Sequence, residues 1–206
     1  MTKRLAVFGA TGHVGRQLVD QALAAGHQVT ALVRDPAKLP PREGLTVVPG
    51  AVQDADACAR TIEGADAVLS ALGTRKLWGV TVCTDGMRAI LPAMKAHGVR
   101  RLIAVGAYAT GENPRKDPYY YAMSLAIRQV MLDKQRQETL IRADGDQWTI
   151  VCPAVLGGGA RTGRYRAGTD LRLGLTSKIS YADVAAFMLE ELGKDAYVRQ
   201  SVAVTS

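Results

Sequence analysis

Three glycines near the N-terminus have the spacing of a phosphate-binding turn, Gly9-x-x-Gly12-x-x-Gly15. An apolar run rich in β-forming residues precedes them and a helical pattern follows, and this order is the context in which such glycines indicate a nucleotide site. Gly9 allows the tight turn, Gly12 lets the backbone approach a pyrophosphate, and Gly15 lets the helix pack close to the strand. N–H groups in the first turn of that helix would face the phosphates. The motif predicts a dinucleotide site, and the alternative is an ordinary tight turn between a strand and a helix.

Two cations follow the second predicted strand, residues 28–33. Arg34 comes directly after the strand and Lys38 lies one helical turn further on. An NAD site needs an acidic residue here to hold the ribose hydroxyls, whereas an NADP site needs a cation. Arg34 can make a planar, two-point contact to the 2′-phosphate and Lys38 can add a point charge, although Asp35 could neutralise Arg34 instead. We therefore expect NADPH/NADP rather than NAD as the cofactor.

The elements that must position these residues alternate along the chain. Apolar runs predict strands over 5–8, 28–33, 45–49, 65–72, 101–106 and 148–153, and helical patterns fall at 13–25, 54–62, 81–97 and 121–142. Such alternation predicts an α/β fold, a doubly wound and mostly parallel sheet with helices on both faces. A capping box at Ser180 and Asp183 opens a further helix. Residues 197–204 could add an edge strand, and the basic segment 161–178 could form a hairpin or a lid.

Composition limits the classes of partner. The 206 residues fit one domain, 1–206, in which we expect residues 107–125 and 154–180 to cover the substrate. The net charge of +7 comes without basic runs interleaved with aromatics, so we expect an anionic cofactor or substrate, or a solvated surface, rather than nucleic acid. No apolar run is long enough to cross a membrane. Cys58, Cys83 and Cys152 lie far apart, which favours a reducing cytoplasm over disulfides or a metal site.

Six stretches of the sequence together match one family. They are Phe8-Gly9-Ala10-Thr11-Gly12, Leu32-Val33-Arg34-Asp35, Leu72-Gly73-Thr74-Arg75, Ala93-Met94-Lys95-Ala96-His97-Gly98-Val99, Thr162-Gly163-Arg164-Tyr165 and Phe187-Met188-Leu189. Over nearly its whole length the chain resembles the atypical short-chain dehydrogenase/reductase branch that contains biliverdin-IXβ reductase/flavin reductase and the NmrA-like NADP-binding proteins. The resemblance implies a single Rossmann-like domain that binds NADPH.

The resemblance also assigns cofactor contacts along the chain. It places Thr11, Gly12, His13 and Val14 at the pyrophosphate, Arg34 and Lys38 at the 2′-phosphate, Val52 beside the adenine, and Leu72, Gly73, Thr74 and Arg75 along the middle of the cofactor. The remaining contacts are expected after the fifth and sixth strands, from Val105, Gly106, Ala107, Pro153, Ala154 and Val155. Ligands of doubly wound sheets lie beyond these carboxyl ends, although the 73–75 segment could equally be a plain polar loop.

The catalytic positions match the family less well. Ala107 stands where the biliverdin reductase pattern has a serine, Val155 where it has a histidine, and Ala51 where it has an acidic residue near the adenine. The Tyr-x-x-x-Lys pair of ordinary short-chain dehydrogenases keeps its lysine as Lys134, but its tyrosine position is Val130. Lys134 could contact a ribose or be a solvated helix lysine.

Tyr108, beside the expected nicotinamide, is the nearest candidate for a proton donor, and its alternative is a packing aromatic. The Tyr119-Tyr120-Tyr121 cluster could cover a planar ring or simply pack.

These replacements favour one reaction class. Reduction of a ketone needs a positioned acid, which normally contributes about 10²–10⁴-fold, whereas a flavin, quinone or linear tetrapyrrole spreads the incoming charge over its own rings. The sequence therefore predicts an NADPH-dependent reductase of a planar aromatic acceptor, and the basic segment 161–178 suits a phosphate or carboxylate on it. The alternatives are a non-catalytic NADP-binding redox sensor of NmrA-like type and a pathway enzyme that acts on a polycyclic natural product. The oligomeric state is left open.

Overall fold

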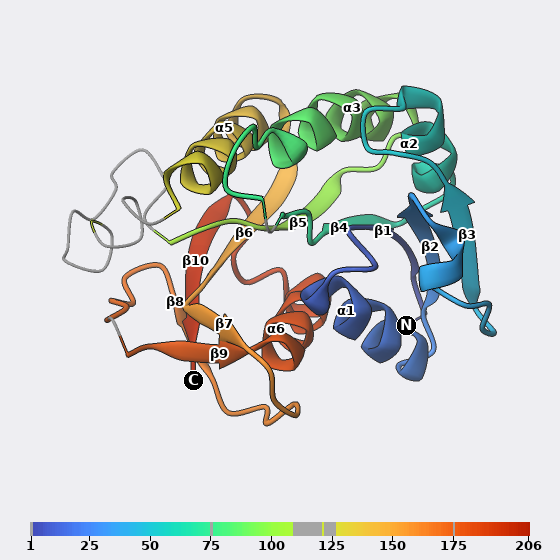
Figure 1. The fold of residues 1–206 in the computed structure, drawn as a ribbon. Coiled ribbons are helices and arrows are strands. Elements are labelled where there is room, and N and C mark those ends of the chain that lie inside the picture. The colour runs from blue at the N-terminus through green and yellow to red at the C-terminus, as the bar shows by residue number, and fades with distance from the viewer. Residues whose placement is uncertain (1, 75, 109–120, 122–126, 175) are drawn as a thin grey trace.

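A twisted parallel sheet forms the centre of the protein in its computed structural model (Figure 1). The structure describes residues 2–74, 76–108, 121, 127–174 and 176–206. Its main sheet has the strand order β3-β2-β1-β4-β5-β6-β10-β8, and only the β10–β8 pair is antiparallel. In chain order these strands are β1 Arg4–Phe8, β2 Gln28–Val33, β3 Leu45–Pro49, β4 Ala67–Ser70, β5 Arg101–Val105, β6 Gln147–Pro153, β8 Arg166–Gly168 and β10 Gln200–Thr205.

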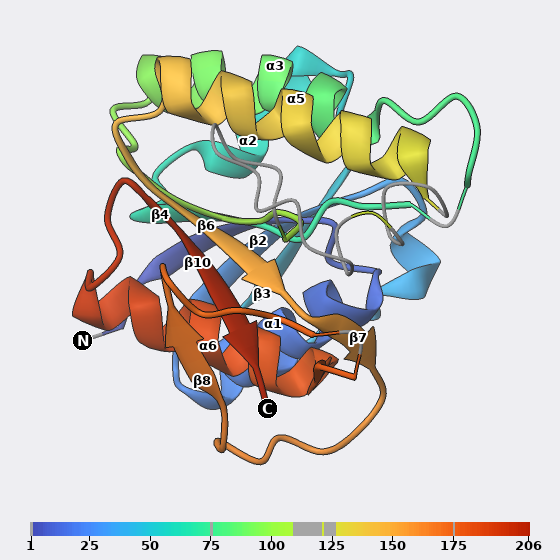
Figure 2. The same ribbon diagram turned by 90° about the vertical axis from the view of Figure 1, so that its left-hand side faces the viewer.

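Helices cover both faces of this sheet. Helices α1 (His13–Ala24) and α6 (Tyr181–Lys194) lie side by side on one face. The other face carries α2 (Ala55–Ile62), α3 (Val82–Ala96) and α5 (Arg128–Asp144), and Figure 2 shows α3 and α5 packed together there. A short 3₁₀ turn, η1 (Pro36–Lys38), follows β2. The predicted Rossmann-like, doubly wound α/β fold is confirmed.

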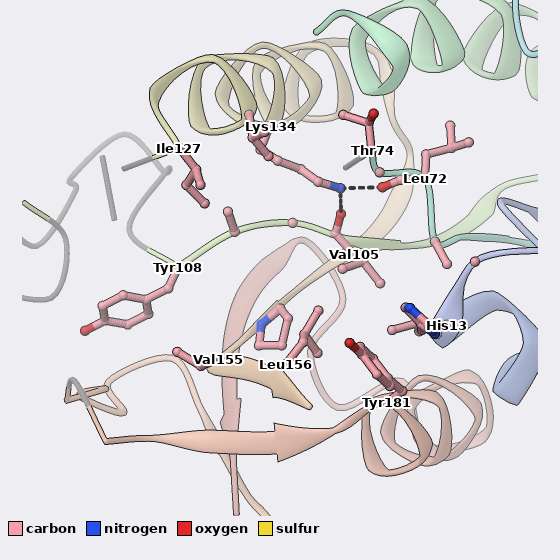
Figure 3. A pocket seen from close by; sticks show the side chains of 18 of the residues that line it. His13, Leu72, Thr74, Val105, Tyr108, Ile127, Lys134, Val155, Leu156 and Tyr181 are labelled. Carbon is pink, nitrogen blue, oxygen red and sulfur yellow. Dashed lines mark hydrogen bonds between the residues drawn. The ribbon is translucent and has the colours of Figure 1, made fainter. Parts of the chain in front are cut away.

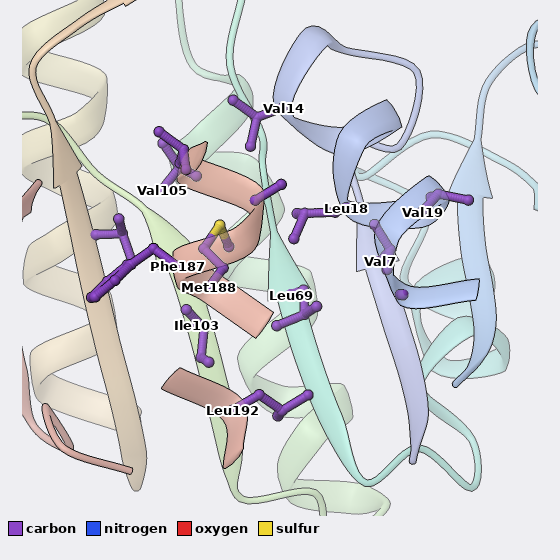
Figure 4. Packing of buried hydrophobic residues seen from close by; sticks show 14 of the residues in the cluster. Val7, Val14, Leu18, Val19, Leu69, Ile103, Val105, Phe187, Met188 and Leu192 are labelled. Atoms are coloured by element: carbon purple, nitrogen blue, oxygen red, sulfur yellow. The ribbon is translucent and has the colours of Figure 1, made fainter. Parts of the chain in front are cut away.

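The strands build two cores because successive side chains point to opposite faces. In β1, Leu5 and Val7 join the core beneath α1 and α6, whereas Ala6 and Phe8 join the core beneath α2, α3 and α5. Figure 4 shows the first core, in which Leu18 of α1 and Met188 of α6 meet the strands. Both faces of the strands are therefore buried, which explains their nearly continuous apolar runs.

The C-terminal third differs from the prediction in two places. The tail strand, predicted at the edge, is β10, and it lies between β6 and β8 inside the sheet. The 161–178 segment is not a hairpin, because β8 pairs with β10, while β9 (Lys178–Ser180) runs parallel to β7 (Val155–Gly157). The pattern identified β10 as a strand but not its neighbours, and it did not predict β7 or β9.

Two further predictions concern the helices. The helix predicted over 121–142 is α5, Arg128–Asp144 in the described part of the chain, and residues 122–126 lie outside that part. Among the described residues, no helix has the length and apolar character needed to span a bilayer.

Candidate functional site

The glycine turn after β1 has the geometry of a close-approach turn. Gly9 has φ +80°, and its carbonyl oxygen accepts the Gly12 N–H at 3.0 Å. A Cβ on Gly9 would lie 2.6 Å from the Ala71 carbonyl oxygen, and one on Gly15 would collide with the Gly9 carbonyl. The turn therefore brings the start of α1 against the ends of β1 and β4, and any side chain at Gly9 or Gly15 would force them apart.

A cleft of about 640 Å³ opens at the carboxyl ends of the strands, beside this turn (Figure 3). Its size is typical of a site for a small molecule or cofactor. The walls come from the start of α1, the ends of β2, β4, β5 and β6, the first turns of α5, strand β7 and the start of α6. The cleft therefore lies where ligands bind in open, doubly wound sheets.

Most of the predicted site residues line this one cleft. They are Gly12, His13, Val14, Arg34, Leu72, Gly73, Thr74, Val105, Gly106, Ala107, Tyr108, Pro153, Ala154 and Val155. The lining does not include Gly9, Thr11, Lys38 or Val52, and Arg75 lies outside the described residues. Gly9 and Thr11 belong to the turn itself. Val52 is partly buried and packs against the core beneath α2, α3 and α5.

Arg34 is the cation that reaches the cleft from the end of β2. Its side chain is exposed and lines the cleft wall. Asp35, the residue that could have neutralised it, instead pairs with Lys38 at 3.4 Å and caps η1 by accepting the Ala37 N–H at 3.2 Å. Among the described residues, Arg34 has no carboxylate within ion-pair distance. The positive charge at this end of the cleft thus rests mainly on Arg34.

Lys134 is buried, so the alternative in which it is a solvated helix lysine is wrong. Its ammonium donates to the carbonyl oxygens of Leu72 at 2.7 Å and Val105 at 2.6 Å, and the Gln137 side-chain oxygen lies at 3.4 Å (Figure 3). The Gln137 amide donates in turn to the Val105 carbonyl. Lys134 thereby ties the chain after β4 to the end of β5 across the upper wall of the cleft. A contact to a ribose stays a prediction.

The neighbouring residue, Asp133, attaches α5 to the start of α3. Its buried carboxylate accepts the N–H groups of Cys83 and Thr84, each at 2.9 Å, and the Thr84 hydroxyl at 2.6 Å. Burial acts to raise the pKa of Asp133, but the hydrogen bonds from Thr84 and Cys83 outweigh it and lower the pKa below its ordinary value. A negative charge at a helix N-terminus is also electrostatically favourable. The Asp133–Lys134 pair thus fixes α5 over the cleft through two adjacent polar anchors.

Aromatic residues line the cleft at two places. Tyr108 is 8% exposed, and its hydroxyl accepts the Leu173 N–H at 3.3 Å, which joins it to the segment before β9. Its role as proton donor stays a prediction. His13 and Tyr181 stack with ring centroids 4.6 Å apart and an interplanar angle of 16°. No motif marked Tyr181, because its place in the cleft depends on the packing of α6 beside α1.

The positions that depart from the family pattern also meet in the cleft. Ala107 and Val155, where the biliverdin reductase pattern has serine and histidine, both line it, and so does Val130, the tyrosine position of ordinary short-chain dehydrogenases. Ile127 and Met131 of the α5 region adjoin them in the lining, and Leu156 follows Val155. This end of the cleft is therefore mainly apolar in the described part of its wall.

The fold and the glycine turn define a nucleotide-binding protein of the Rossmann class. The chain belongs to the NAD(P)H-binding family, whose sequence profile matches residues 9–195.

Known proteins resemble the chain to different extents. It is 34% identical over 106 residues to a 3β-hydroxysteroid dehydrogenase/Δ5→4-isomerase of Mycobacterium tuberculosis, a match that covers 52% of this chain and only 29% of that protein. The structure of ChuY, an anaerobilin reductase of Escherichia coli O157:H7, has a TM-score of 0.84 at 22% identity, over 98% of this chain and 96% of ChuY. The structure of a Veillonella parvula short-chain dehydrogenase/reductase in complex with NADP also has a TM-score of 0.84, at 18% identity. This match covers 100% of this chain and 95% of the Veillonella chain.

Proposed function

We propose that the protein is an NADPH-dependent reductase that transfers a hydride to a planar conjugated acceptor, such as a flavin, a quinone or a linear tetrapyrrole. The observation that carries this proposal is the shape of the site. One cleft of about 640 Å³ is lined by the cation Arg34, by the start of the helix that follows the glycine turn, and by an apolar end formed by α5 and β7. Both reactants would then meet in a single sheltered space.

The cofactor end suits NADPH. Gly12 is exposed, lines the cleft and leaves the backbone open to a pyrophosphate, and the first-turn N–H groups of α1 have no acceptor within the helix. Arg34 at the end of β2 offers the planar cation that a 2′-phosphate requires. Lys38 would act more weakly, because Asp35 already holds its ammonium. When bound, NADPH would supply a hydride, which carries two electrons and one hydrogen.

The acceptor end suits a flat apolar ring. Ile127, Val130 and Met131 lie on the α5 side, and Val155 and Leu156 come from β7. Val155 is 38% exposed and Leu156 is 36% exposed, so both offer apolar surface that a ring would cover. Burying such surface is favourable by about 25 cal/mol per Å². The similarity to ChuY supports a tetrapyrrole-like acceptor as one member of this class.

The chemistry of the wall favours acceptors that hold charge themselves. Ala107, Val130 and Val155 supply no proton at the positions where the family patterns have serine, tyrosine and histidine. A conjugated acceptor delocalises the negative charge that arrives with the hydride, and water can supply the proton afterwards. The exposed arginines of the 161–178 segment could pair with a carboxylate or phosphate of such an acceptor.

A spectrophotometric screen tests the proposal. Purified protein is mixed with NADPH or NADH and a panel of flavins, quinones and linear tetrapyrroles, and loss of absorbance at the dihydronicotinamide band is followed. Faster oxidation of NADPH than NADH with at least one acceptor is expected. Tight binding of NADP without turnover across the panel would contradict the proposal and favour the redox-sensor alternative.

A further inference from the structure

The stacked pair His13–Tyr181 brings together the starts of two helices. His13 is the first residue of α1 and Tyr181 is the first residue of α6, and both line the cleft. Their rings stack at 4.6 Å. In Figure 3 the Tyr181 ring rises from α6 with its hydroxyl toward the interior of the cleft, while the hydroxyl of Tyr108 points in another direction. The stack fixes the Tyr181 ring, and the hydroxyl is left facing the cleft.

The backbone beneath Tyr181 is held from several sides. Ser180 pairs with Gly157 in the β7–β9 sheet, and its hydroxyl accepts the Asp183 N–H at 3.0 Å as the cap of α6. The Asp183 carboxylate accepts the N–H groups of Thr162 at 2.8 Å and Gly163 at 2.9 Å. Tyr181 and the apolar residues of β7 thus belong to one rigid unit, which is what precise placement of a hydroxyl needs.

Other polar side chains of the described wall are less suited to meet an acceptor. Lys134 donates to two carbonyls and to an amide oxygen, which engages its three protons. The Tyr108 hydroxyl oxygen accepts the Leu173 N–H, and in Figure 3 this hydroxyl points away from the part of the cleft that Tyr181 faces. The Thr74 hydroxyl accepts the Lys76 N–H within its own loop, and Arg34 lies at the cofactor end. Tyr181 therefore offers the hydroxyl best placed for a second ligand.

We infer that Tyr181 is a catalytic residue of the proposed reductase, and that its hydroxyl donates a hydrogen bond to a carbonyl oxygen conjugated with the acceptor ring. This inference rests on the proposed function. Hydride uptake by the ring breaks a carbon–oxygen π bond and leaves the negative charge on that oxygen. Tyr181 keeps its proton and stabilises the charge through the hydrogen bond, and water then protonates the oxygen. The N-terminus of α6 favours the same negative charge, because the helix dipole is positive there.

The inference makes carbonyl-bearing acceptors the preferred class. A neutral quinone becomes an anion when it takes up a hydride, and it profits from a donor at its oxygen. A cationic phenazinium dye becomes neutral when it takes up a hydride, and it has no carbonyl oxygen that could accept a hydrogen bond from Tyr181. The effect of the hydroxyl should therefore depend on the acceptor.

The test compares wild type, Tyr181→Phe and the matched control Tyr197→Phe, with menadione and phenazine methosulfate as acceptors. Tyr181→Phe keeps the ring that stacks on His13 and removes only the hydroxyl, whereas the Tyr197 hydroxyl bonds the Ala167 carbonyl outside the cleft. Rates without protein are subtracted. We expect Tyr181→Phe to lower kcat with menadione roughly 10- to 100-fold, less than the loss of a fully enclosed oxyanion donor costs, because Tyr181 is partly exposed. The rate of Tyr181→Phe with phenazine methosulfate should stay within about twofold of the wild-type rate. Both rates of Tyr197→Phe should also stay within about twofold of wild type.

A binding measurement accompanies the rates. Calorimetric titration with menadione alone should show affinity about three- to tenfold weaker in Tyr181→Phe, the loss of one neutral hydrogen bond. NADPH affinity and the thermal midpoint should stay unchanged, which separates loss of the hydroxyl from loss of folding. Equal effects on the two acceptors, or an unchanged rate with menadione, would overturn the role of Tyr181 while leaving the proposed function intact. A wild type that reduces no acceptor would overturn both.

Discussion

Replacing Arg34 with alanine should remove most of the preference for NADPH over NADH. Arg34 is the cation that lines the cleft at the end of β2, and its neighbour Asp35 is paired with Lys38 rather than with it. A hydrogen bond between charged groups contributes about 1.5–3 kcal/mol, so the variant should bind NADPH roughly 10- to 150-fold more weakly. NADH carries no 2′-phosphate and should lose almost nothing.

Fluorescence titration with NADPH and NADH at one ionic strength measures both dissociation constants. Arg88→Ala removes an exposed arginine of α3 that does not line the cleft, and it should leave both constants unchanged. Lys38→Ala should weaken NADPH by no more than about 1 kcal/mol, because the ammonium is exposed and already paired with Asp35. Higher salt should reduce the difference in NADPH affinity between wild type and Arg34→Ala, because salt screens the attraction between Arg34 and the 2′-phosphate. Equal losses for NADPH and NADH in Arg34→Ala would show that the 2′-phosphate binds elsewhere.

Three further predictions concern stability. Lys134→Met should lower the free energy of unfolding by about 1–3 kcal/mol, because the carbonyl oxygens of Leu72 and Val105 lose the ammonium as a donor. An unchanged free energy of unfolding in urea denaturation would contradict this role of Lys134. Asp133→Asn should be less stable than wild type at pH 7. Its native pKa is lowered, so the deficit should be complete above the ordinary value of 3.8 and shrink as the pH falls below it; a deficit independent of pH would refute this. Gly15→Ala should lower the thermal midpoint, because its Cβ would collide with the Gly9 carbonyl, whereas Gly193→Ala has open space; equal midpoints would count against this account of the turn.

The sequence predicted the N-terminal half of the fold closely because its signals are local. Strands β2 and β3 have the predicted bounds, since buried parallel strands are apolar runs that end at turn residues. Asp54 caps α2 by accepting the Ala57 N–H at 3.0 Å, and Ser180 caps α6. The place of β10 was predicted wrongly because strand order depends on contacts that a local pattern does not contain.

The candidate site was only partly predictable, for a related reason. The glycine turn and the strand ends follow from sequence spacing, and they supply most of the cleft lining. Helix α5 is the opposite case, because it buries polar residues, among them Asp133, Lys134 and Gln137. Helical periodicity assigns such residues to solvent, whereas here they bond to α3 and to the strand ends. Tyr181 depends on the packing of α1 against α6, which no local pattern shows.

The interior position of β10 has a consequence for how the protein is synthesised. Strands β1 to β5 and the glycine turn can emerge from the ribosome and begin to pair before the C-terminal third exists. Strand β6 then keeps an unpaired apolar edge until residues 200–205 have also emerged, because β10 is its neighbour on that side. The unit that carries Tyr181, built from residues between 155 and 183, emerges shortly before β10. The nascent chain therefore passes through a stage with a formed cofactor turn, an open cleft and an exposed strand edge, the state in which unfinished β-sheets associate with other chains.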